Sequence, residues 1–240
     1  MRIGVMDDDE AQAARVADLL TSFGHNCAVY HSGKAMLTAL RQETFDLLVL
    51  DWNVPDVNGV KVLASVRQQH EDHLPILMLT NRSDEADIVS ALGAGADDYV
   101  VKPVPGAVLG ARVNALLRRS YPPDNKGGQE IFENFRFERA TECVWIEQTC
   151  VQLTSKEFSL ALLLFRNLYR ALSRGYILEA VWGRNPDLPT RTLDQHVSRV
   201  RTKLGLRPHN GYRLATVYSY GYRLEKLLPQ ERFAAEEISE

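Results

Sequence analysis

The first half of the chain alternates five short apolar runs with longer amphipathic stretches, and this alternation constrains the fold more than any other feature. The apolar runs cover residues 3–6, 27–30, 46–50, 75–79 and 98–101. Each run is too short for a typical helix, and several are continuously apolar, as strands covered on both faces are. The stretches between the runs place apolar residues three or four positions apart, which predicts helices with one face against a sheet. Five strand-then-helix repeats predict a doubly wound α/β domain with a five-stranded parallel sheet.

Charge divides the chain into two unlike halves. Residues 1–120 contain 11 Lys and Arg against 16 Asp and Glu, whereas residues 126–228 contain 16 against 10. Opposite net charges in two segments of ordinary domain length predict two domains. The proline-rich, glycine-rich and polar stretch between them predicts a linker. We therefore expect a first domain at 1–120, a linker at 121–129, a second domain at 130–228 and a disordered acidic tail at 229–240.

Neither a membrane segment nor a cysteine framework is predicted. No apolar run approaches the roughly 18 residues that span a bilayer, and MRIGVMDDDE lacks the regions of a signal peptide. We expect a soluble, cytoplasmic protein without membrane contact. The three cysteines, Cys27, Cys143 and Cys150, are odd in number and show no CxxC spacing. We therefore expect neither a disulfide nor a zinc site, and we interpret Cys143 and Cys150 as buried small residues rather than redox groups.

Polar residues stand where four of the predicted strands end. Asp7 and Asp8 follow the first strand, Asp51 follows the third, Thr80 follows the fourth and Lys102 follows the fifth. Ligands in open α/β sheets bind beyond the carboxyl ends of the strands. If the first and third strands are neighbours, three carboxylates converge there, and like charges so close need a cation. Mg²⁺ suits such a site because it prefers oxygen ligands and leaves positions for phosphate oxygens.

These residue types together favour phosphoryl transfer. A carboxylate beside Mg²⁺ can attack phosphorus and become an aspartyl phosphate, which is the role we expect for Asp51. Thr80 offers a hydroxyl to a phosphoryl oxygen, and Lys102 offers a cation to the developing charge. One such residue alone is more often a solvated strand end, but five at strand ends favour a site. The neighbouring Asp9 is interpreted as a solvated helix start.

The second half begins with alternating residues that predict a small antiparallel sheet. Ile131, Phe135 and Phe137 alternate with polar neighbours, and the segment VWIEQTCVQL follows. Such alternation is typical of strands with one buried face. Thr154 and Glu157 then form the T-x-x-E pattern of a helix-capping box. The sequence therefore predicts a sheet followed at once by a helix.

Two further helices and a hairpin complete the predicted second domain. The second helix is expected near 174–182, the third is RTLDQHVSRVRTKL (191–204), and YRLATVYSYGYRL predicts two strands around a turn. Three helices and a hairpin form a winged helix-turn-helix. The polar strip of the third helix has the width that enters a DNA major groove, but taken alone a basic solvated face would be the favoured alternative, and it is the hairpin after the helix that favours DNA binding. Its expected anchors are Leu193, Val197, Val200 and Leu204, and its polar strip contains Arg191, Thr192, Gln195, His196, Ser198, Arg199, Thr202 and Lys203.

These motifs resemble those of two-component response regulators of the OmpR/PhoB subfamily over nearly the whole chain. The strand-end residues resemble a receiver domain, and LTSKEF, AVWG, RTLDQHVSRVRTKL and GYRL resemble the effector domain. The resemblance implies that a sensor histidine kinase phosphorylates Asp51. It implies Mg²⁺ ligands, a switch pair and a Lys-Pro step that is usually cis. These are, in turn, Asp7, Asp8, Asp51 and the carbonyl of Asn53; Thr80 and Tyr99; and Lys102-Pro103.

The resemblance also implies a homodimer through the fourth helix, the fifth strand and the fifth helix. Ile88 and Val108 stand where relatives place an ion pair, so we expect association to depend less on salt or on phosphorylation. Asn81 stands after Thr80 where a small residue is usual, and we expect it to alter the dephosphorylation rate. The remaining interface residues fall where two charged pairs lie: Asp97 with Arg112, and Asp98 with Arg119.

For DNA, the resemblance implies that Arg199 is the best candidate for base contact. The wing of relatives commonly carries Val-Arg-Gly where this chain has Val217, Tyr218 and Ser219, so Tyr218 is expected to stack or hydrogen-bond in place of a minor-groove arginine. The residues expected near phosphates or flanking bases are Arg191, His196, Arg201 and Lys203.

We therefore expect a non-enzymatic transcription regulator in which phosphorylation of Asp51 switches dimerisation and binding to double-stranded promoter DNA, with RNA polymerase as a further partner. A regulator of the same fold that acts without phosphorylation, through constitutive dimerisation or protein contacts, is the alternative. A hydrolytic enzyme is disfavoured, because MDDDEAQ lacks the flanking threonine of haloacid-dehalogenase-like phosphatases. The complete set of strand-end residues favours phosphotransfer.

Overall fold

The chain forms two compact units, residues 1–123 and 124–240. A computed structural model describes residues 1–69, 74–121, 128–183 and 190–228. Most of the predicted linker and the whole predicted acidic tail lie outside the described residues. Among those that are described, no helix has both the length and the apolar character needed to cross a bilayer.

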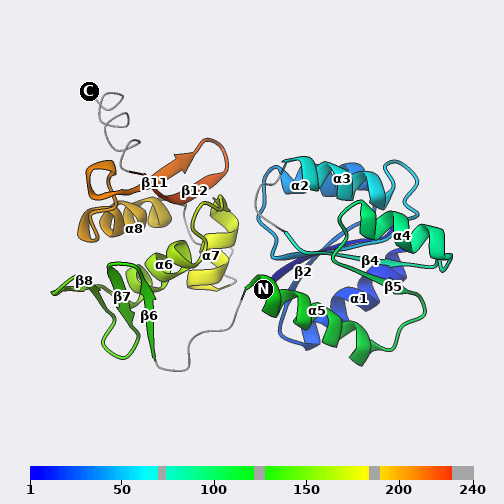
Figure 1. Cartoon of the computed structure of the whole chain (residues 1–240), viewed down its shortest axis with the longest axis horizontal. Coiled ribbons are helices and arrows are strands. Elements are labelled where there is room, and N and C mark those ends of the chain that lie inside the picture. Colours follow the sequence, from blue (N-terminus) through cyan, green and yellow to red (C-terminus); the bar gives the residue numbers. More distant parts are fainter. Residues whose placement is uncertain (70–73, 122–127, 184–189, 229–240) are drawn as a thin grey trace. The chain divides into compact units, whose positions relative to one another are not determined.

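The first unit is a five-stranded parallel sheet with helices on both faces, which confirms the predicted fold class. The strand order is β2-β1-β3-β4-β5, so β1 and β3 are neighbours, as the convergence of carboxylates requires. Helices α2 and α3 cover one face, and α1 and α5 cover the other (Figure 1). The strands are β1 (Arg2–Met6), β2 (Asn26–Tyr30), β3 (Leu47–Leu50), β4 (Ile76–Thr80) and β5 (Asp98–Val101), and the helices are α1 (Glu10–Ser22), α2 (Gly33–Leu40), α3 (Gly59–Gln69), α4 (Glu85–Gly93) and α5 (Gly106–Ser120).

Strand β3 shows why its sequence is apolar without interruption. Leu48 and Leu50 pack into the core beneath α2 and α3, whereas Leu47 and Val49 pack into the core beneath α1 and α5. Successive side chains of a strand point to opposite faces, so a strand covered on both faces needs apolar residues at every position. The first polar residue, Asp51, therefore marks the end of the covered strand.

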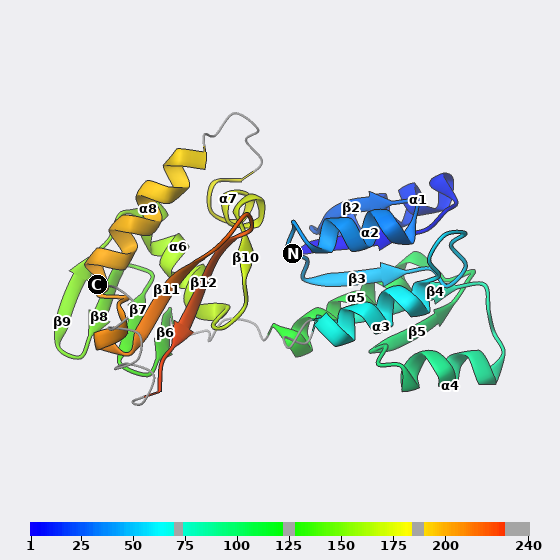
Figure 2. The ribbon, with the colours of Figure 1, turned by 90° about the horizontal axis from the view of Figure 1, so that it is seen from above.

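The described residues of the second unit form two small sheets and three α-helices, as the sequence predicts for a winged helix-turn-helix. The four-stranded antiparallel sheet has the order β6-β7-β8-β9, and the three-stranded sheet has the order β10-β12-β11. Figure 2 shows β11 and β12 as a long hairpin beside α8. The elements are β6 (Gln129–Phe132), β7 (Phe135–Glu138), β8 (Cys143–Ile146), β9 (Thr149–Gln152), α6 (Ser155–Arg166), β10 (Leu172–Ser173), α7 (Arg174–Trp182), α8 (Thr190–Lys203), the 3-10 helix η1 (Pro208–Asn210), β11 (Tyr212–Val217) and β12 (Gly221–Lys226).

Local signals and aromatic packing fix the centre of this unit. The predicted capping box is confirmed: the Thr154 hydroxyl accepts from the Glu157 amide, and the Glu157 carboxylate accepts from the Thr154 amide. Phe165 of α6 contacts the rings of Phe135, Phe137 and Tyr212 with centroids 4.7 to 5.7 Å apart. These buried rings join α6 to both sheets, and such aromatic contacts add to the stabilisation from burial alone.

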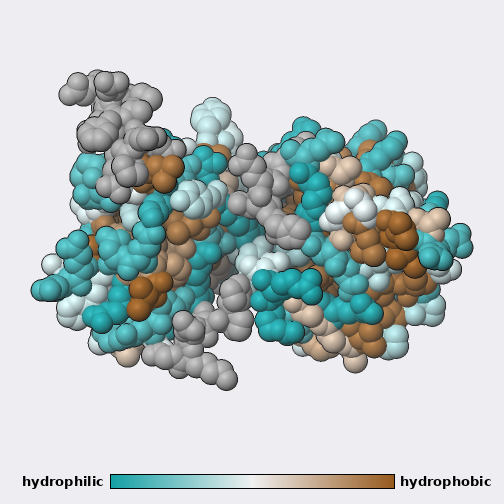
Figure 3. All heavy atoms as spheres, in the orientation of Figure 1, coloured by the Kyte–Doolittle hydropathy of each residue, from teal (hydrophilic) through white to brown (hydrophobic). Residues whose placement is uncertain are grey.

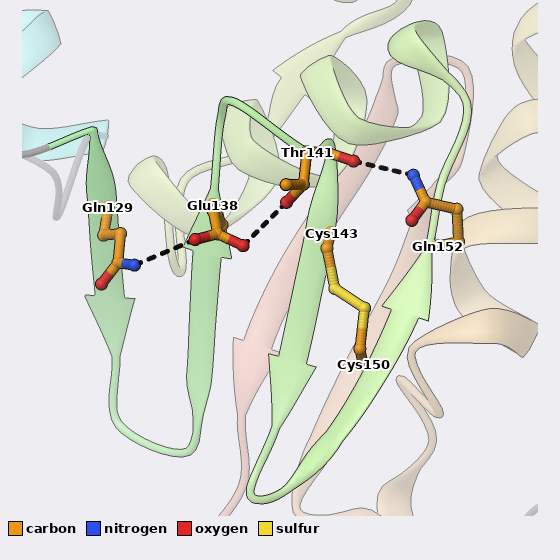
Figure 4. The surroundings of a disulfide bond; sticks show 6 residues. All are labelled: Gln129, Glu138, Thr141, Cys143, Cys150 and Gln152. Carbon is orange, nitrogen blue, oxygen red and sulfur yellow. Dashed lines mark hydrogen bonds between the residues drawn. A yellow bond between two sulfur atoms is a disulfide. The ribbon is translucent and has the colours of Figure 1, made fainter.

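The cysteine prediction is wrong, because Cys143 and Cys150 form a disulfide (Figure 4). Two residues connect β8 to β9, and the hairpin register places Cys143 opposite Gln152 and Cys150 opposite Trp145. These are neighbouring pairs on the same face of the sheet, and the two Cα atoms lie 6.1 Å apart, within the usual range for a disulfide. An odd count and the lack of a CxxC motif say nothing about such a pair, because hairpin register brings it together.

Candidate metal centre and nucleic-acid interface

Three carboxylates converge at one edge of the parallel sheet. Asp7 directly follows β1 and Asp51 directly follows β3, and these strands are neighbours. Ligand oxygens of Asp7, Asp8 and Asp51 all lie within 4.8 Å of one another. Asp7 and Asp51 are buried, whereas Asp8 is exposed. The structure thus brings together the three carboxylates that the sequence singles out as metal ligands.

Lys102 connects two of these carboxylates from the end of β5. Its Nζ donates to Asp7 Oδ2 at 2.7 Å and to Asp51 Oδ2 at 3.0 Å, with only 6% of the lysine side chain exposed. The peptide bond between Lys102 and Pro103 is cis, as the resemblance implies. One ammonium leaves this carboxylate cluster with net negative charge, which favours a further cation.

The donor set fits Mg²⁺. Burial raises the pKa of Asp7, and the hydrogen bond and charge of Lys102 oppose that rise. A divalent cation would oppose it further. All three side chains offer carboxylate oxygens, and exposed Asp8 leaves one side open for the waters that Mg²⁺ retains. Asn53 lies two residues beyond Asp51, and its backbone N–H donates to Asp51 Oδ1 at 3.3 Å. The backbone carbonyl of Asn53 as a fourth ligand stays a prediction.

One close backbone approach and one pair of hydrogen bonds hold the loop that follows Asp51. A Cβ added to Gly59 would lie 2.0 Å from the Asp51 carbonyl oxygen, so only glycine allows this approach. The Asp56 carboxylate accepts from the amides of Gly33 and Lys34 at the start of α2, at 2.9 and 3.0 Å. Hydrogen bonds from backbone amides, that of Lys34 foremost, lower the pKa of Asp56 to about 2. The loop is therefore fastened to both α2 and α3.

The predicted switch pair meets at one loop residue, Arg82. Thr80 is fully buried at the end of β4, and its hydroxyl accepts from the Arg82 amide at 3.4 Å. The Tyr99 hydroxyl donates to the Arg82 carbonyl at 3.0 Å, and burial raises the pKa of Tyr99. Asn81, which lies between Thr80 and Arg82 in the chain, is exposed. A change at Thr80 can therefore reach Tyr99 through a single peptide segment.

The side chain of Arg82 joins the loop that follows Asp51 (residues 52–58, the acceptor loop) to α4, a contact that the sequence does not predict. Its guanidinium lies 5.0 Å from the centre of the Trp52 ring, donates to Asn53 Oδ1 at 3.2 Å and pairs with Asp87 of α4 at 3.2 Å. No local sequence pattern predicts the contact between Arg82 and Asn53, which are 29 residues apart. The only signal in the sequence is Trp52 itself, an aromatic residue at the start of a polar loop.

The predicted dimer surface is partly apolar and partly engaged within the chain. Figure 3 shows hydrophobic residues gathered over α4, where Val89 is 63% and Leu92 is 45% exposed. Val108 of α5 is also exposed, and Ile88 is half-buried. Among the charged residues, Arg112 pairs with Asp98 at 2.9 Å, Asp97 accepts from Arg67 and the Ile76 amide, and Arg119 is exposed.

The structure divides the residues predicted to contact DNA into two groups. The four predicted apolar anchors are buried, three within α8 and Leu204 directly after it. Arg191 and Arg199 are exposed on α8, and Tyr218 is 94% exposed at the turn between β11 and β12. The others contact the protein itself: the His196 ring lies 5.1 Å from Trp182, Arg201 donates to the Leu214 carbonyl, and Lys203 donates to Glu157 at 2.7 Å.

Glu157 makes the Lys203 contact structural. Only 2% of the Glu157 side chain is exposed. Burial would raise its pKa, but hydrogen bonds from Lys203 and Thr154 outweigh burial and lower the pKa. The pair thus joins the start of α6 to the last turn of α8. A phosphate contact by Lys203 stays a prediction, and it would have to compete with this pair.

Comparisons with known proteins cover both units. Residues 3–114 match the family of response regulator receiver domains, and residues 147–224 match the C-terminal domain of transcriptional regulatory proteins. The chain is 35% identical to the sensory transduction protein RegX3 of Mycobacterium tuberculosis, over 92% of this chain and 97% of the relative. It is 38% identical to the transcriptional regulatory protein AfsQ1 of Streptomyces coelicolor and 35% identical to the DNA-binding response regulator MtrA of Mycolicibacterium smegmatis, over 92% of this chain and 96% of each relative.

Proposed function

We propose that this chain, which belongs to the OmpR/PhoB family of two-component response regulators, accepts a phosphoryl group on Asp51 from a sensor histidine kinase. In this family a receiver domain controls a DNA-binding domain. The observation that carries the proposal is the buried contact of Lys102 with both Asp7 and Asp51, beside Asp8. That arrangement supplies a nucleophile, a cation and a set of metal ligands in one place, and these four residues, Asp7, Asp8, Asp51 and Lys102, are called the pocket.

The residues of the pocket divide the work. Mg²⁺, when bound, supplies positive charge to the phosphoryl oxygens, and Asp7, Asp8, Asp51 and the Asn53 carbonyl would hold it. The Asp51 carboxylate attacks phosphorus, the bond from phosphorus to the histidine nitrogen of the kinase breaks, and the histidine leaves. Lys102 then donates to a phosphoryl oxygen in place of the carboxylate oxygen that has reacted.

The phosphoryl group is read by the residues around Arg82. It adds close to two negative charges and three strong acceptors, which attract the Thr80 hydroxyl away from the Arg82 amide. Tyr99 and α4 follow, because Tyr99 contacts the Arg82 carbonyl and the Arg82 side chain contacts Asp87. Helix α4 is suited to move, since Ala91 is its only fully buried residue and the Asp84 side chain makes no capping hydrogen bond.

Intact mass after incubation with acetyl phosphate and Mg²⁺ tests the acceptor. The wild-type protein should gain one phosphoryl group, and Asp51→Asn should gain none because the nucleophilic oxygen is lost. Asp18→Asn, an exposed carboxylate on α1, is the matched control and should be phosphorylated normally. A phosphoryl group on the Asp51→Asn protein would contradict the proposal. Wild-type protein that binds promoter DNA but never takes up a phosphoryl group would favour the regulator that acts without phosphorylation.

We further propose a homodimer through α4, β5 and α5, supported by the exposed apolar residues on α4 and α5. An apolar contact is not screened by salt, so the dimer should persist in about 1 M salt, where the Debye length is only ~3 Å. Ile88→Lys should weaken it in analytical ultracentrifugation, whereas Ile131→Lys, an exposed residue of β6, should not. Dissociation in high salt, or no effect of Ile88→Lys, would contradict this interface.

The second unit would bind double-stranded promoter DNA through α8 and the β11–β12 hairpin. Exposed Arg191 and Arg199 suit base edges and phosphates, and Tyr218 at the tip of the hairpin suits stacking or hydrogen bonding in the adjacent groove. Contact with RNA polymerase and a cytoplasmic location follow from this role.

A further inference from the structure

The disulfide lies on the outer face of the four-stranded sheet. Val144 and Ile146 of β8 and Val151 of β9 contact the core of the second unit. Side chains alternate along a strand, so Cys143, Cys150 and Gln152 belong to the opposite face. Figure 4 shows the sulfur bridge between β8 and β9 on this face, with Glu138 and Gln152 beside it. Breaking the bridge would therefore leave the packing of the hydrophobic core unchanged.

Hairpin contacts other than the bridge also join β8 to β9. Main-chain pairing joins every residue of β8 to β9, and Gln152 donates to the Thr141 carbonyl. At the far end, the Leu153 amide donates to the Glu142 carbonyl, and Ser155 donates to the Glu142 carboxylate. A cross-link over only seven residues removes little further freedom from a hairpin that is already paired. The two sulfur atoms would thus stay close when reduced, ready to form the bond again.

The two cysteines differ in access. Cys150 is exposed, whereas Cys143 is only 2% exposed. If the reduced pair keeps this difference, a dissolved disulfide reaches Cys150 before Cys143, and Cys150 reacts first. Proteins that act on DNA work where thiols are kept reduced, and disulfides in such compartments are usually transient.

We propose that Cys143 and Cys150 form a reversible thiol–disulfide pair, a modification site for low-molecular-weight disulfides such as oxidised glutathione. The Cys150 thiolate attacks one sulfur of the dissolved disulfide, a mixed disulfide forms and the first thiolate leaves. The Cys143 thiolate then attacks the Cys150 sulfur and displaces the second thiolate. Two protein thiols are oxidised to one disulfide, and one dissolved disulfide is reduced to two thiols, so atoms and electrons balance.

Thiol counting across a glutathione redox series tests the site in the full chain. The Cys27→Ser variant leaves only the two thiols of interest, and alkylation after an acid quench followed by intact mass reports their state. Both thiols should disappear together as the oxidised fraction of glutathione rises, and dithiothreitol should restore both without denaturant. Far-UV circular dichroism should be the same before and after. Two thiols that stay reactive throughout the series, or a bridge that is reduced only in urea, would overturn the proposal.

Single variants in the Cys27→Ser background test the order of reaction. Cys143→Ala should accumulate a mixed disulfide with glutathione, because the buried partner that resolves it is missing. Cys150→Ser should be modified at least about tenfold more slowly, since the remaining thiol is buried. Cys150→Ala repeats the measurement with a different side chain, and circular dichroism identifies any variant that fails to fold. Equal modification rates for the two sites, or a disulfide between two chains, would contradict the assignment.

Discussion

The pocket beside the parallel sheet and the basic face of α8 are both charged, but their charges have different partners. In the pocket, Asp7, Asp51 and Lys102 are buried and contact one another. On α8, Lys203 and Arg199 are both exposed, but Lys203 donates to the buried Glu157 carboxylate. A buried charge without a partner is costly, so the pocket residues depend on one another. Residues of the α8 face should act almost independently, and substitutions there should add.

The largest effect should come from removing the cation of the pocket. Lys102→Met leaves two buried carboxylates without their shared partner, so the free energy of unfolding at neutral pH should fall by about 3–5 kcal/mol. Added Mg²⁺ should recover part of the loss by supplying positive charge to the same oxygens. Urea unfolding with and without Mg²⁺ measures both effects. The control is Lys61→Met at an exposed position of α3, and an equal loss in the two variants would show that burial of the lysine is not the cause.

Arg199→Ala should have the next largest effect, on DNA binding rather than folding. We expect a loss of about 1–3 kcal/mol in binding to the specific site and relaxed specificity at the contacted base. Thermal unfolding should be unchanged, because the side chain is exposed. Fluorescence anisotropy with specific and random duplexes at several salt concentrations measures the difference. Equal losses on the two duplexes would show that Arg199 contacts only the phosphate backbone.

Lys203→Ala should lower the stability of the fold and leave DNA binding nearly unchanged, because Lys203 is paired with a buried carboxylate. The change leaves Glu157 with its capping hydrogen bonds but without its cation, and we expect the unfolding free energy to fall by about 1–2 kcal/mol. Binding to specific and random DNA should change little. Lys203→Arg, which preserves the charge, should restore most of the stability. Weaker binding to all duplexes with unchanged stability would instead support the original prediction of a phosphate contact.

The smallest effect concerns Asp56, an exposed carboxylate that fastens the acceptor loop to α2. Its folded pKa of about 2 is below the ordinary value of 3.8, so its contribution to stability is present above that ordinary value and is lost as pH falls toward 2. Asp56→Asn should therefore be less stable than wild type at pH 5, and the two should converge between pH 4 and about 2. Urea unfolding across this range, with Asp18→Asn as control, measures it. A difference that stays constant with pH would show that charge is not the cause.

The sequence by itself determined the elements and the types of residue at the pocket. Short apolar runs predicted the five strands, and the T-x-x-E pattern predicted the start of α6, because strand burial and helix capping depend on residues close in the chain. The predicted second helix at 174–182 coincides with α7. The pocket could be assembled in advance for a similar reason: once the strands are placed, their carboxyl ends share one edge of the sheet.

Only the tertiary structure decided which side chains meet. Cys143 meets Cys150 through hairpin register, Arg82 reaches Asn53 across 29 residues, and Lys203 reaches Glu157 across 46. No periodicity or short motif encodes these contacts, because they depend on how separate elements are packed. A helical spacing shows which residues share a face, but whether a cation on that face is paired within the protein depends on the buried carboxylate that the neighbouring helix presents.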